Sequence, residues 1–355
     1  MTYFPRFSRL RLSRRVVSIA ATVAMVGATA VAASQGAAQA AASAQGQLSS
    51  LHDAKIASVI APNGDQNPYG IAIVPITSGI LTQGDLLVAD FNNGAGASGA
   101  GTTILQVNPT TGASSVFYSG VASTGPVGIA INPNNDGVWI GDYGTATDGT
   151  SANDLLISPA GSLLANFNNA TTLGDTSFVG VWGQAVSSAN GSVSFYWGNA
   201  GNATTGTGGG SVWRLSPHPT GTPNGQPVHS TYAEITYGQA GTPAGGSVAT
   251  AAGPQGMVFD AATGTLYETN SASNALYAIP TAATATGPVN TSIVYQGPAL
   301  VSPENVVINP LNGDLLVVNG GNNDLVEITP TGSVVAKVNF STSARRGALR
   351  PGGYY

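Results

Sequence analysis

One short apolar pattern recurs five times along the chain, and this repeat constrains the fold more than any other feature. The first two copies read Pro-x-Gly-Ile-Ala-Ile, and three further short runs follow each copy. Most of these runs are rich in β-branched or aromatic residues and are bounded by Gly, Pro, Asn or Asp, which is typical of β-strands. No helical period survives after residue 60, because Gly and Pro interrupt it. The copies begin at 68–73, 126–131, 181–186, 254–259 and 303–308.

Four strands per repeat predict an all-β fold, a β-propeller with five recognisable four-stranded blades. A single sheet of this size cannot bury both of its faces, whereas blades stacked around an axis can. The third position of the pattern is Gly in four copies and Asn305 in the fifth, and we expect these glycines to allow close backbone approach near the axis. The blades are predicted at about 68–120, 126–170, 178–238, 254–297 and 303–340, within a propeller domain at 45–340.

The sequence is compatible with either five or six blades. Residues 55–61 read as a lone strand ahead of the first blade, as expected if the amino terminus supplies the outer strand of a closing blade. Residues 341–355 follow the fifth blade and are a basic tail or the remnant of a last blade. We therefore predict a six-bladed plan with an incomplete closing blade, which a change of reading frame near residue 344 would produce. The alternative is a ring of five blades with a tail.

Charge is scarce and unevenly distributed. Only 8% of the residues are charged, and residues 53–340 hold all 16 carboxylates against three cations, a net charge of −13. In residues 1–47 and 341–355, all of the charged residues are Arg. An acidic body lacks the basic face that neutralises phosphates, so nucleic acid is excluded as a partner. Protonation of the carboxylates leaves little charge, which predicts tolerance of strong acid because self-repulsion stays small.

The amino terminus predicts export. Five Arg precede an uncharged run at 16–33, and small-residue steps follow it, which is the order of a cleavable signal peptide. Residues 1–44 are therefore assigned to a signal peptide and a small-residue linker, and the protein to a secreted or periplasmic location. Residues 13–17 resemble a twin-arginine motif, so the Sec and twin-arginine routes both stay open. A retained membrane anchor is the alternative. The chain has no Cys, so packing without disulfides must stabilise the fold.

The pattern Pro-x-Gly-Ile-Ala-Ile, a turn, Leu-Leu-Val-Ala-Asp and a strand ending near Pro-x-x-Gly resembles NHL-repeat β-propellers over residues 55–340. The family's superfold hosts binding proteins as well as enzymes, so the resemblance implies an architecture more than an activity. A more distant similarity to SMP-30/gluconolactonase-type propellers implies a Glu, Asn and Asp set around a metal. This chain departs from the NHL pattern in its lack of Lys and Arg and in Val181-Trp182-Gly183.

Equivalent positions of a propeller face the same end of its central channel, and this places one candidate binding site. The residues before the opening position and those that end the second strands supply carboxylates, amides and aromatics. Such a set suits Ca²⁺ or a small polar, sugar-like ligand. Alternatively, Asp and Asn end these strands by bonding turn amides. The candidate binding residues are Tyr69, Trp182, Gln255, Glu304, Asp90, Asp142, Asn270 and Asn319, with Asn199 equivalent in the third blade.

A second acidic group has a spacing of six residues: Asp136, Asp142, Asp148 and Asp154. The segment from Asn132 superficially resembles a calcium loop. Its twelfth position, however, is Tyr143 where such a loop has Glu, so turn formation explains the pattern better. The metal assignment stays unknown.

No catalytic residues are predicted. The three histidines, His52, His218 and His229, do not lie at converging strand ends, and the chain has no nucleophile elbow, zinc-protease or phosphate-loop motif. We expect an exported, non-catalytic module, a monomer that binds a ligand or protein or acts as a scaffold, without a cofactor unless Ca²⁺ binds. It would meet a membrane only through an uncleaved signal. The alternatives are a metal-dependent lactonase-like hydrolase that uses the channel mouth and a structural cell-envelope protein.

Overall fold

The computed structural model describes residues 55–144, 151–168, 178–189, 192–202, 209–216, 231–236 and 252–340, with the single positions 48, 205, 239 and 241. The predicted signal segment 1–44 and the tail 341–355 lie outside the described residues. No helix in the described part is long and apolar enough to cross a membrane.

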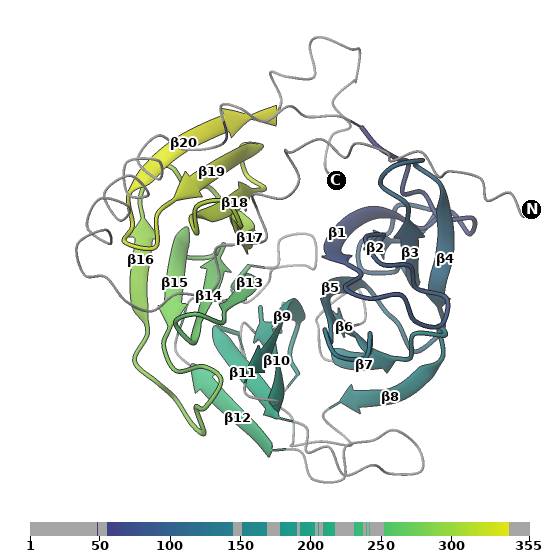
Figure 1. The fold of residues 1–355 in the computed structure, drawn as a ribbon, viewed down its shortest axis with the longest axis horizontal. Helices are drawn as coiled ribbons and strands as arrows, with labels where there is room; N and C mark the ends of the chain where they lie inside the picture. Colours follow the sequence, from purple (N-terminus) through teal and green to yellow (C-terminus); the bar gives the residue numbers. More distant parts are fainter. Residues whose placement is uncertain are drawn as a thin grey trace, which may run out of the picture.

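Twenty strands form five antiparallel four-stranded sheets, each a blade in chain order (Figure 1). Blade one is β1 (Gln66–Ile73), β2 (Leu86–Asn92), β3 (Thr103–Val107) and β4 (Ser114–Ser119). Blade two is β5 (Pro126–Ile131), β6 (Val138–Asp142), β7 (Asn153–Ile157) and β8 (Leu163–Asn168). Blade three is β9 (Val181–Ala189), β10 (Ser192–Asn199), β11 (Ser211–Ser216) and β12 (Thr231–Thr236). Blade four is β13 (Pro254–Asp260), β14 (Thr265–Asn270), β15 (Ala275–Ile279) and β16 (Ser292–Gln296). Blade five is β17 (Pro303–Ile308), β18 (Leu315–Asn319), β19 (Asp324–Ile328) and β20 (Val334–Asn339).

The blades are arranged around a centre as a five-bladed β-propeller, with the first strand of each blade innermost (Figure 1). The predicted fold class and its five blades are confirmed. Successive inner strands pack on one another, β1 on β5, β5 on β9, β9 on β13 and β13 on β17. No comparable packing joins β17 to β1 within the described ranges, so the ring is open between blades five and one.

The glycines that open the inner strands lie against the backbone of the next blade, as predicted. A Cβ at Gly128 would lie 2.6 Å from the Trp182 carbonyl oxygen, and one at Gly183 would overlap the Gln255 carbonyl oxygen. Only Gly allows two strands to approach so closely. The fifth blade has Asn305 at this position, and no described inner strand follows it.

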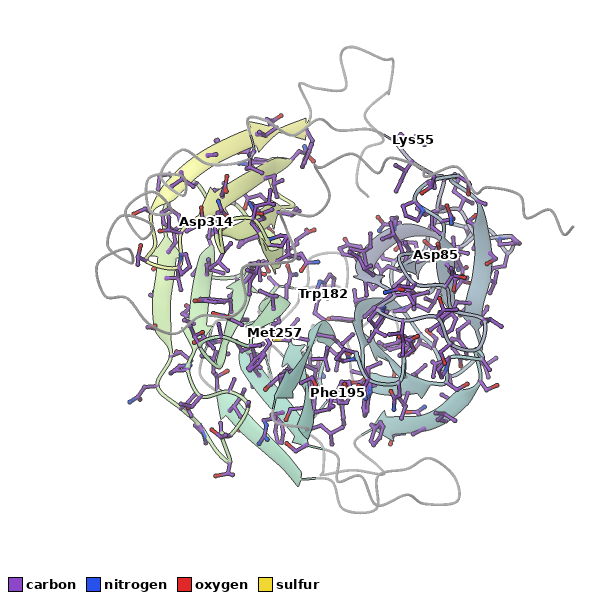
Figure 2. All side chains as sticks on the ribbon, in the orientation of Figure 1. Lys55, Asp85, Trp182, Phe195, Met257 and Asp314 are labelled. Atoms are coloured by element: carbon purple, nitrogen blue, oxygen red, sulfur yellow. The ribbon has the colours of Figure 1, made fainter. Side chains whose placement is uncertain are left out.

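Apolar side chains fill the spaces between neighbouring blades. Ile129 and Ile131 of β5 pack against blade one, while Ala130 between them packs with blade three. Inner-strand side chains therefore alternate between the preceding and the following blade. Between blades two and three, the ring of Trp139 stacks on Phe195 with centroids 4.1 Å apart, and Figure 2 labels Phe195 there.

The segment 55–61 forms no strand, so the predicted closing strand is wrong in its secondary structure. Its Ala57, Val59 and Ala61 nevertheless pack on the two middle strands of blade one, β2 and β3. The strand-forming prediction fails because a strand needs a hydrogen-bonding partner, and the described residues contain no inner strand of a sixth blade beside this segment. At the other flank, buried Leu48 donates its backbone N–H to a carboxylate oxygen of Glu327 in blade five, at 3.2 Å.

Candidate functional site

The residues that end the second strands are buried, and those of blades two, three and five bond to the loop that enters their own blade. In blade two, Asp142 accepts a hydrogen bond from the Ser123 hydroxyl at 3.0 Å. In blade three, the side-chain oxygen of Asn199 accepts from Val179 N–H at 3.2 Å, and its amide donates to Ser211 at 3.1 Å. These contacts fix the path of the chain into the inner strand.

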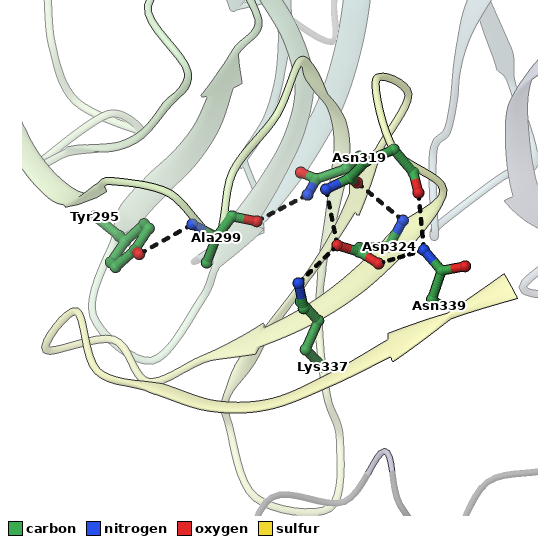
Figure 3. Close-up of polar contacts among 7 residues, drawn as sticks. Tyr295, Ala299, Asn319, Asp324, Lys337 and Asn339 are labelled. Atoms are coloured by element: carbon green, nitrogen blue, oxygen red, sulfur yellow. Dashed lines mark hydrogen bonds and ion pairs between the residues drawn. The ribbon is translucent and has the colours of Figure 1, made fainter. Parts of the chain in front are cut away.

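Blades four and five repeat this use of an amide. Asn270 accepts from the N–H of Ser273 at 3.1 Å, in the turn that follows its strand. Asn319 donates to the carbonyl of Ala299 at 2.8 Å, and Ala299 N–H in turn donates to the Tyr295 hydroxyl at 3.3 Å (Figure 3). Strand-ending Asn side chains therefore serve as internal braces, which is the role that turn-forming residues commonly have.

Buried carboxylates without a cation partner are the main electrostatic feature of this end of the ring. Both carboxylate oxygens of Asp90 are buried and have no hydrogen-bond partner in the described part of the chain. Burial, with the charge of Asp65 adding to it, raises the pKa of Asp90 to about 7. Burial likewise raises the pKa of Asp142 to about 8 and that of Glu268 to about 8.

The acidic series in blade two does not converge on one point. Asp154 lies opposite Gly141, beside Asp142, and burial followed by the charge of Asp142 raises its pKa well above the ordinary range. Asp136 instead accepts a hydrogen bond from Ile76 N–H of blade one at 3.3 Å. Asp148 lies outside the described residues. The described residues contain no group of three His, Cys, Asp or Glu that could hold a metal ion.

Two of the residues that precede the opening glycines, Tyr69 and Trp182, meet near the centre of the ring (Figure 2). Tyr69 of blade one and Trp182 of blade three lie edge to face with ring centroids 5.3 Å apart, and Phe91 and Tyr143 complete the cluster. Trp182 lies close to the centre in Figure 2. Aromatic side chains from blades one to three thus pack this end of the channel.

The other half of this end is polar. Gln255 is buried, while Glu304 of β17 is half-buried. Burial raises the pKa of Glu304. Glu304 makes no hydrogen bond or ion pair with any described residue, and its carboxylate lies against Gly320. Of the eight candidate binding residues, Tyr69 and Glu304 are the two that keep partial exposure.

Blades one and five expose aliphatic side chains where they face each other across the open part of the ring. The sequence alone did not identify this surface. Ile71 and Ile73 of β1 are 54% and 67% exposed, whereas the equivalent Ile129 and Ile131 of β5 are 8% and 6% exposed. Opposite them, blade five exposes Val307 of β17 and Val318 of β18. We call these four residues the open side. The predicted incomplete closing blade is the signal that could have located it.

In blade one, the segment at 57–61 covers side chains of the two middle strands, β2 and β3. Ala57, Val59 and Ala61 pack over Val88 and Leu105 of blade one, which are buried. Leu48 lies at Glu327 of blade five. Ile71 and Ile73 of β1 and Val307 of β17 stay exposed on the innermost strands, and Val318 stays exposed on the neighbouring strand β18.

Comparisons with known proteins show the fold. A scan against protein-family models found no match, and a search of curated protein sequences found no significant relative. Among solved structures, the chain is similar to one of a nidogen/laminin complex, with a TM-score of 0.50, 12% identity, and coverage of 79% of this chain and 82% of that one.

Two further structures have lower scores. Streptogramin B lyase matches with a TM-score of 0.46, 14% identity and coverage of 81% and 72% of the two chains. An auxiliary nutrient binding protein from Bacteroides thetaiotaomicron VPI-5482 matches with a TM-score of 0.49, 13% identity and coverage of 76% and 57%. At such identities the likeness is one of fold. The chain is a β-propeller, and its NHL-repeat and gluconolactonase resemblances remain expectations.

Proposed function

We propose that this protein is an exported, non-catalytic binding module that holds an extended polypeptide segment at its open side. The observation that carries the proposal is the exposure of Ile71 and Ile73 on an innermost strand, where the equivalent side chains of β5 are buried. Aliphatic surface left uncovered on a folded domain commonly marks an interaction site. Export is supported by the signal-like segment 1–44.

The shape and charge of the open side indicate the kind of ligand. Two sheet faces, β1 with β2 and β17 with β18, flank it, so an extended segment with apolar side chains on both faces continues the stack of blades. The body carries a net charge of −13 between residues 53 and 340, and Glu304 lies at the channel end of β17. A basic segment is therefore favoured by long-range attraction.

A selection from random twelve-residue peptides displayed on phage tests this function. We expect the mature protein to enrich aliphatic, basic sequences. We expect Ile73→Asp to weaken their binding by at least about tenfold, because the bound peptide would bury a charge in place of an aliphatic side chain. Leu163→Asp is the matched control, since Leu163 is a 43% exposed aliphatic side chain on β8, in blade two. Equal binding by both variants, or no enrichment, would contradict the proposal.

A second candidate is the metal-dependent lactonase-like hydrolase, which Glu304 supports as a half-buried carboxylate at the channel end without a described partner. The Asn and Asp braces support it less, because Asn270 and Asn319 bond to backbone groups. Metal analysis of the purified mature protein separates the candidates. Stoichiometric Ca²⁺ or Zn²⁺ that is lost in Glu304→Gln would favour the hydrolase, and we expect no such metal.

A further inference from the structure

We propose that the side chains of Lys337 and Asn322 in blade five join covalently, through an amide bond between Lys337 Nζ and Asn322 Cγ that forms with loss of ammonia. Asp324, which contacts both side chains, carries the proton between them. The bond fastens β20, the outermost strand of blade five, to the turn that precedes β19. The inference is independent of the ligand at the open side, because it concerns only side chains of this blade.

One carboxylate oxygen contacts both of the nitrogen atoms that take part. Lys337 Nζ lies 3.0 Å from Asp324 Oδ2, and Asn322 Nδ2 donates to the same oxygen at 2.8 Å (Figure 3). Asp324 is 3% exposed, so these contacts are direct and shielded from solvent. An oxygen that touches both the attacking and the departing nitrogen has the position that a proton carrier needs.

The pairing of β19 with β20 explains why Lys337 reaches this carboxylate. Asp324 lies opposite Asn339, two positions along β20 from Lys337. Lys337 is therefore a diagonal neighbour of Asp324 on the same face of the sheet, a separation that a long side chain spans. Asn339 Nδ2 donates to the other carboxylate oxygen, Asp324 Oδ1, at 2.6 Å and holds the carboxylate in place (Figure 3).

The carbonyl group of the Asn322 side chain is polarised for attack. Its oxygen accepts a hydrogen bond from Asp324 N–H at 3.1 Å. A donor at this oxygen stabilises the negative charge that develops there when an amine adds to the carbonyl carbon. A nucleophile, a proton carrier and an oxyanion donor thus surround one amide, which is the set that acyl transfer requires.

The atoms and protons of the step balance without any further reactant. Asp324 takes one proton from the Lys337 ammonium group, and the neutral amine attacks Asn322 Cγ. Asp324 gives that proton to Asn322 Nδ2, and the Cγ–Nδ2 bond breaks. The departing ammonia takes up the second proton, which Nζ releases as the amide forms. The products are the amide, an ammonium ion and an unchanged Asp324 carboxylate.

Two other turns have the same Asn–Asp geometry but no lysine. In the turns at 63–65 and 312–314, the Asn side chain also donates to the Asp carboxylate and accepts from the Asp N–H, at 2.9–3.1 Å. The chain has two lysines, and Lys337 with Asp324 is the one ion pair among the described residues. The turn itself braces a bend, and Lys337 makes the copy at 322–324 reactive.

The link would restrain the last blade of the described ring. The chain has no Cys, so a disulfide cannot hold β20 to its blade. An amide that encloses residues 322–337 restrains the unfolded chain as a disulfide would, and it opposes the release of β20.

The bond should form slowly. A lysine amine attacks only in its neutral form, which is the minor form at neutral pH. Half of the Lys337 side chain is exposed, so solvent also competes for the amine. The contact with Asp324 nevertheless keeps the two groups together, which raises their effective concentration. We therefore expect the ion pair in freshly prepared protein and the amide after incubation, with faster formation at pH 9 than at pH 7.

Proteolysis of the incubated mature protein at glutamate tests the proposal. Glu327 lies between Asn322 and Lys337, so cleavage after glutamate separates peptides 305–327 and 328–355 unless the amide joins them. After incubation at pH 9 and denaturation, we expect the two peptides to remain joined. Their combined mass should lie about 17 Da, one ammonia, below the sum of the two.

Three variants separate this reaction from others. Lys337→Arg keeps a positive charge beside Asp324 without an amine that can be acylated, and Asp324→Asn removes the proton carrier. Both should give two separate peptides. Asn312→Ala is the matched control, since Asn312 belongs to the equivalent turn in the same peptide, and it should leave the peptides joined.

Separate peptides of full mass from the incubated, unaltered protein would overturn the proposal. The same mass loss confined to one peptide would also overturn it. Within 305–327 such a loss indicates a cyclic imide at an asparagine, and within 328–355 it indicates a link from Lys337 to Asn339. Joined peptides in Lys337→Arg would show that the link uses another residue.

Discussion

Gly183→Ala is expected to destabilise the protein by at least about 3 kcal/mol, and to do so without removing any side-chain contact. A Cβ at this position would overlap the Gln255 carbonyl oxygen of the next blade. The obstacle is backbone near the start of β13, not the end of a flexible side chain, so relief requires that blades three and four move apart. That movement would loosen the aliphatic and aromatic packing between them, around Tyr196 and Met257.

Chemical denaturation followed by far-UV circular dichroism measures this effect, with Gly287→Ala as the matched control. Gly287 has no atom within 4 Å of a Cβ position, so its substitution should change the free energy of unfolding by less than about 0.5 kcal/mol. A similar result for Gly183→Ala would mean that the inner strands are not in the close contact described above.

The sequence was sufficient for the blades because their determinants are local. Each blade is a run of short strands separated by turn residues, and the predicted inner strand at 303–308 coincides with β17, Pro303–Ile308. The glycine positions were interpretable for the same reason. Gly70 and Gly128 occupy one position of the repeat, and the repeat requires a close neighbour at that position.

The closing of the ring was harder to predict, because it depends on partners distant in sequence. Residues 55–61 are rich in β-branched residues, as strands are, but the described structure offers them side-chain contacts without a ladder of hydrogen bonds. Composition reports the preference of a segment for extended backbone. It does not report whether a neighbouring strand is present to pair with it.

The sequence likewise predicted one part of the candidate site and not another. Repeat equivalence correctly placed Tyr69 and Trp182 at one end of the ring, where their rings meet. It could not show that Asn319 is committed to the Ala299 carbonyl, since both open binding and internal bracing require the same amide. Whether the amide is exposed to a ligand or buried against its own loop decides between these roles. That exposure depends on how the blades pack together, which the sequence of one repeat does not show.

The pH dependence of stability should be opposite to that of most acidic proteins, with the fold most stable in acid and weaker above neutral pH. Burial raises the pKa of Asp142 to about 8 and of Glu268 to about 8, from unfolded values of 3.8 and 4.5. Between those values the folded chain binds more protons than the unfolded one. Each group therefore lowers the free energy of unfolding by up to about 1.4 kcal/mol for every pH unit from about 4 to about 8.

Asp142→Asn and Glu268→Gln isolate this effect, because each resembles the protonated side chain in size and has no charge to release. Each substitution should flatten the fall in stability between pH 5 and pH 8, and it should have little effect at pH 4. Asp324→Asn is the control of opposite sign. Burial favours a high pKa for Asp324, but hydrogen bonds from Asn339 and Lys337 and the Lys337 charge 3.0 Å away outweigh it and lower the pKa. Its substitution should therefore weaken the fold at pH 7 and not at pH 2.

Circular dichroism and denaturant titrations from pH 2 to pH 9 decide the question. Acid unfolding usually has two sources, protonation of paired carboxylates and repulsion among the remaining positive charges. The described residues contain one ion pair, Lys337 with Asp324, and residues 53–340 hold only three cations, so both sources are weak here. We expect the β-sheet signal to persist at pH 2. Its loss above pH 4 would show that carboxylates ionised in the native state control stability, which contradicts the raised pKa values of Asp142 and Glu268.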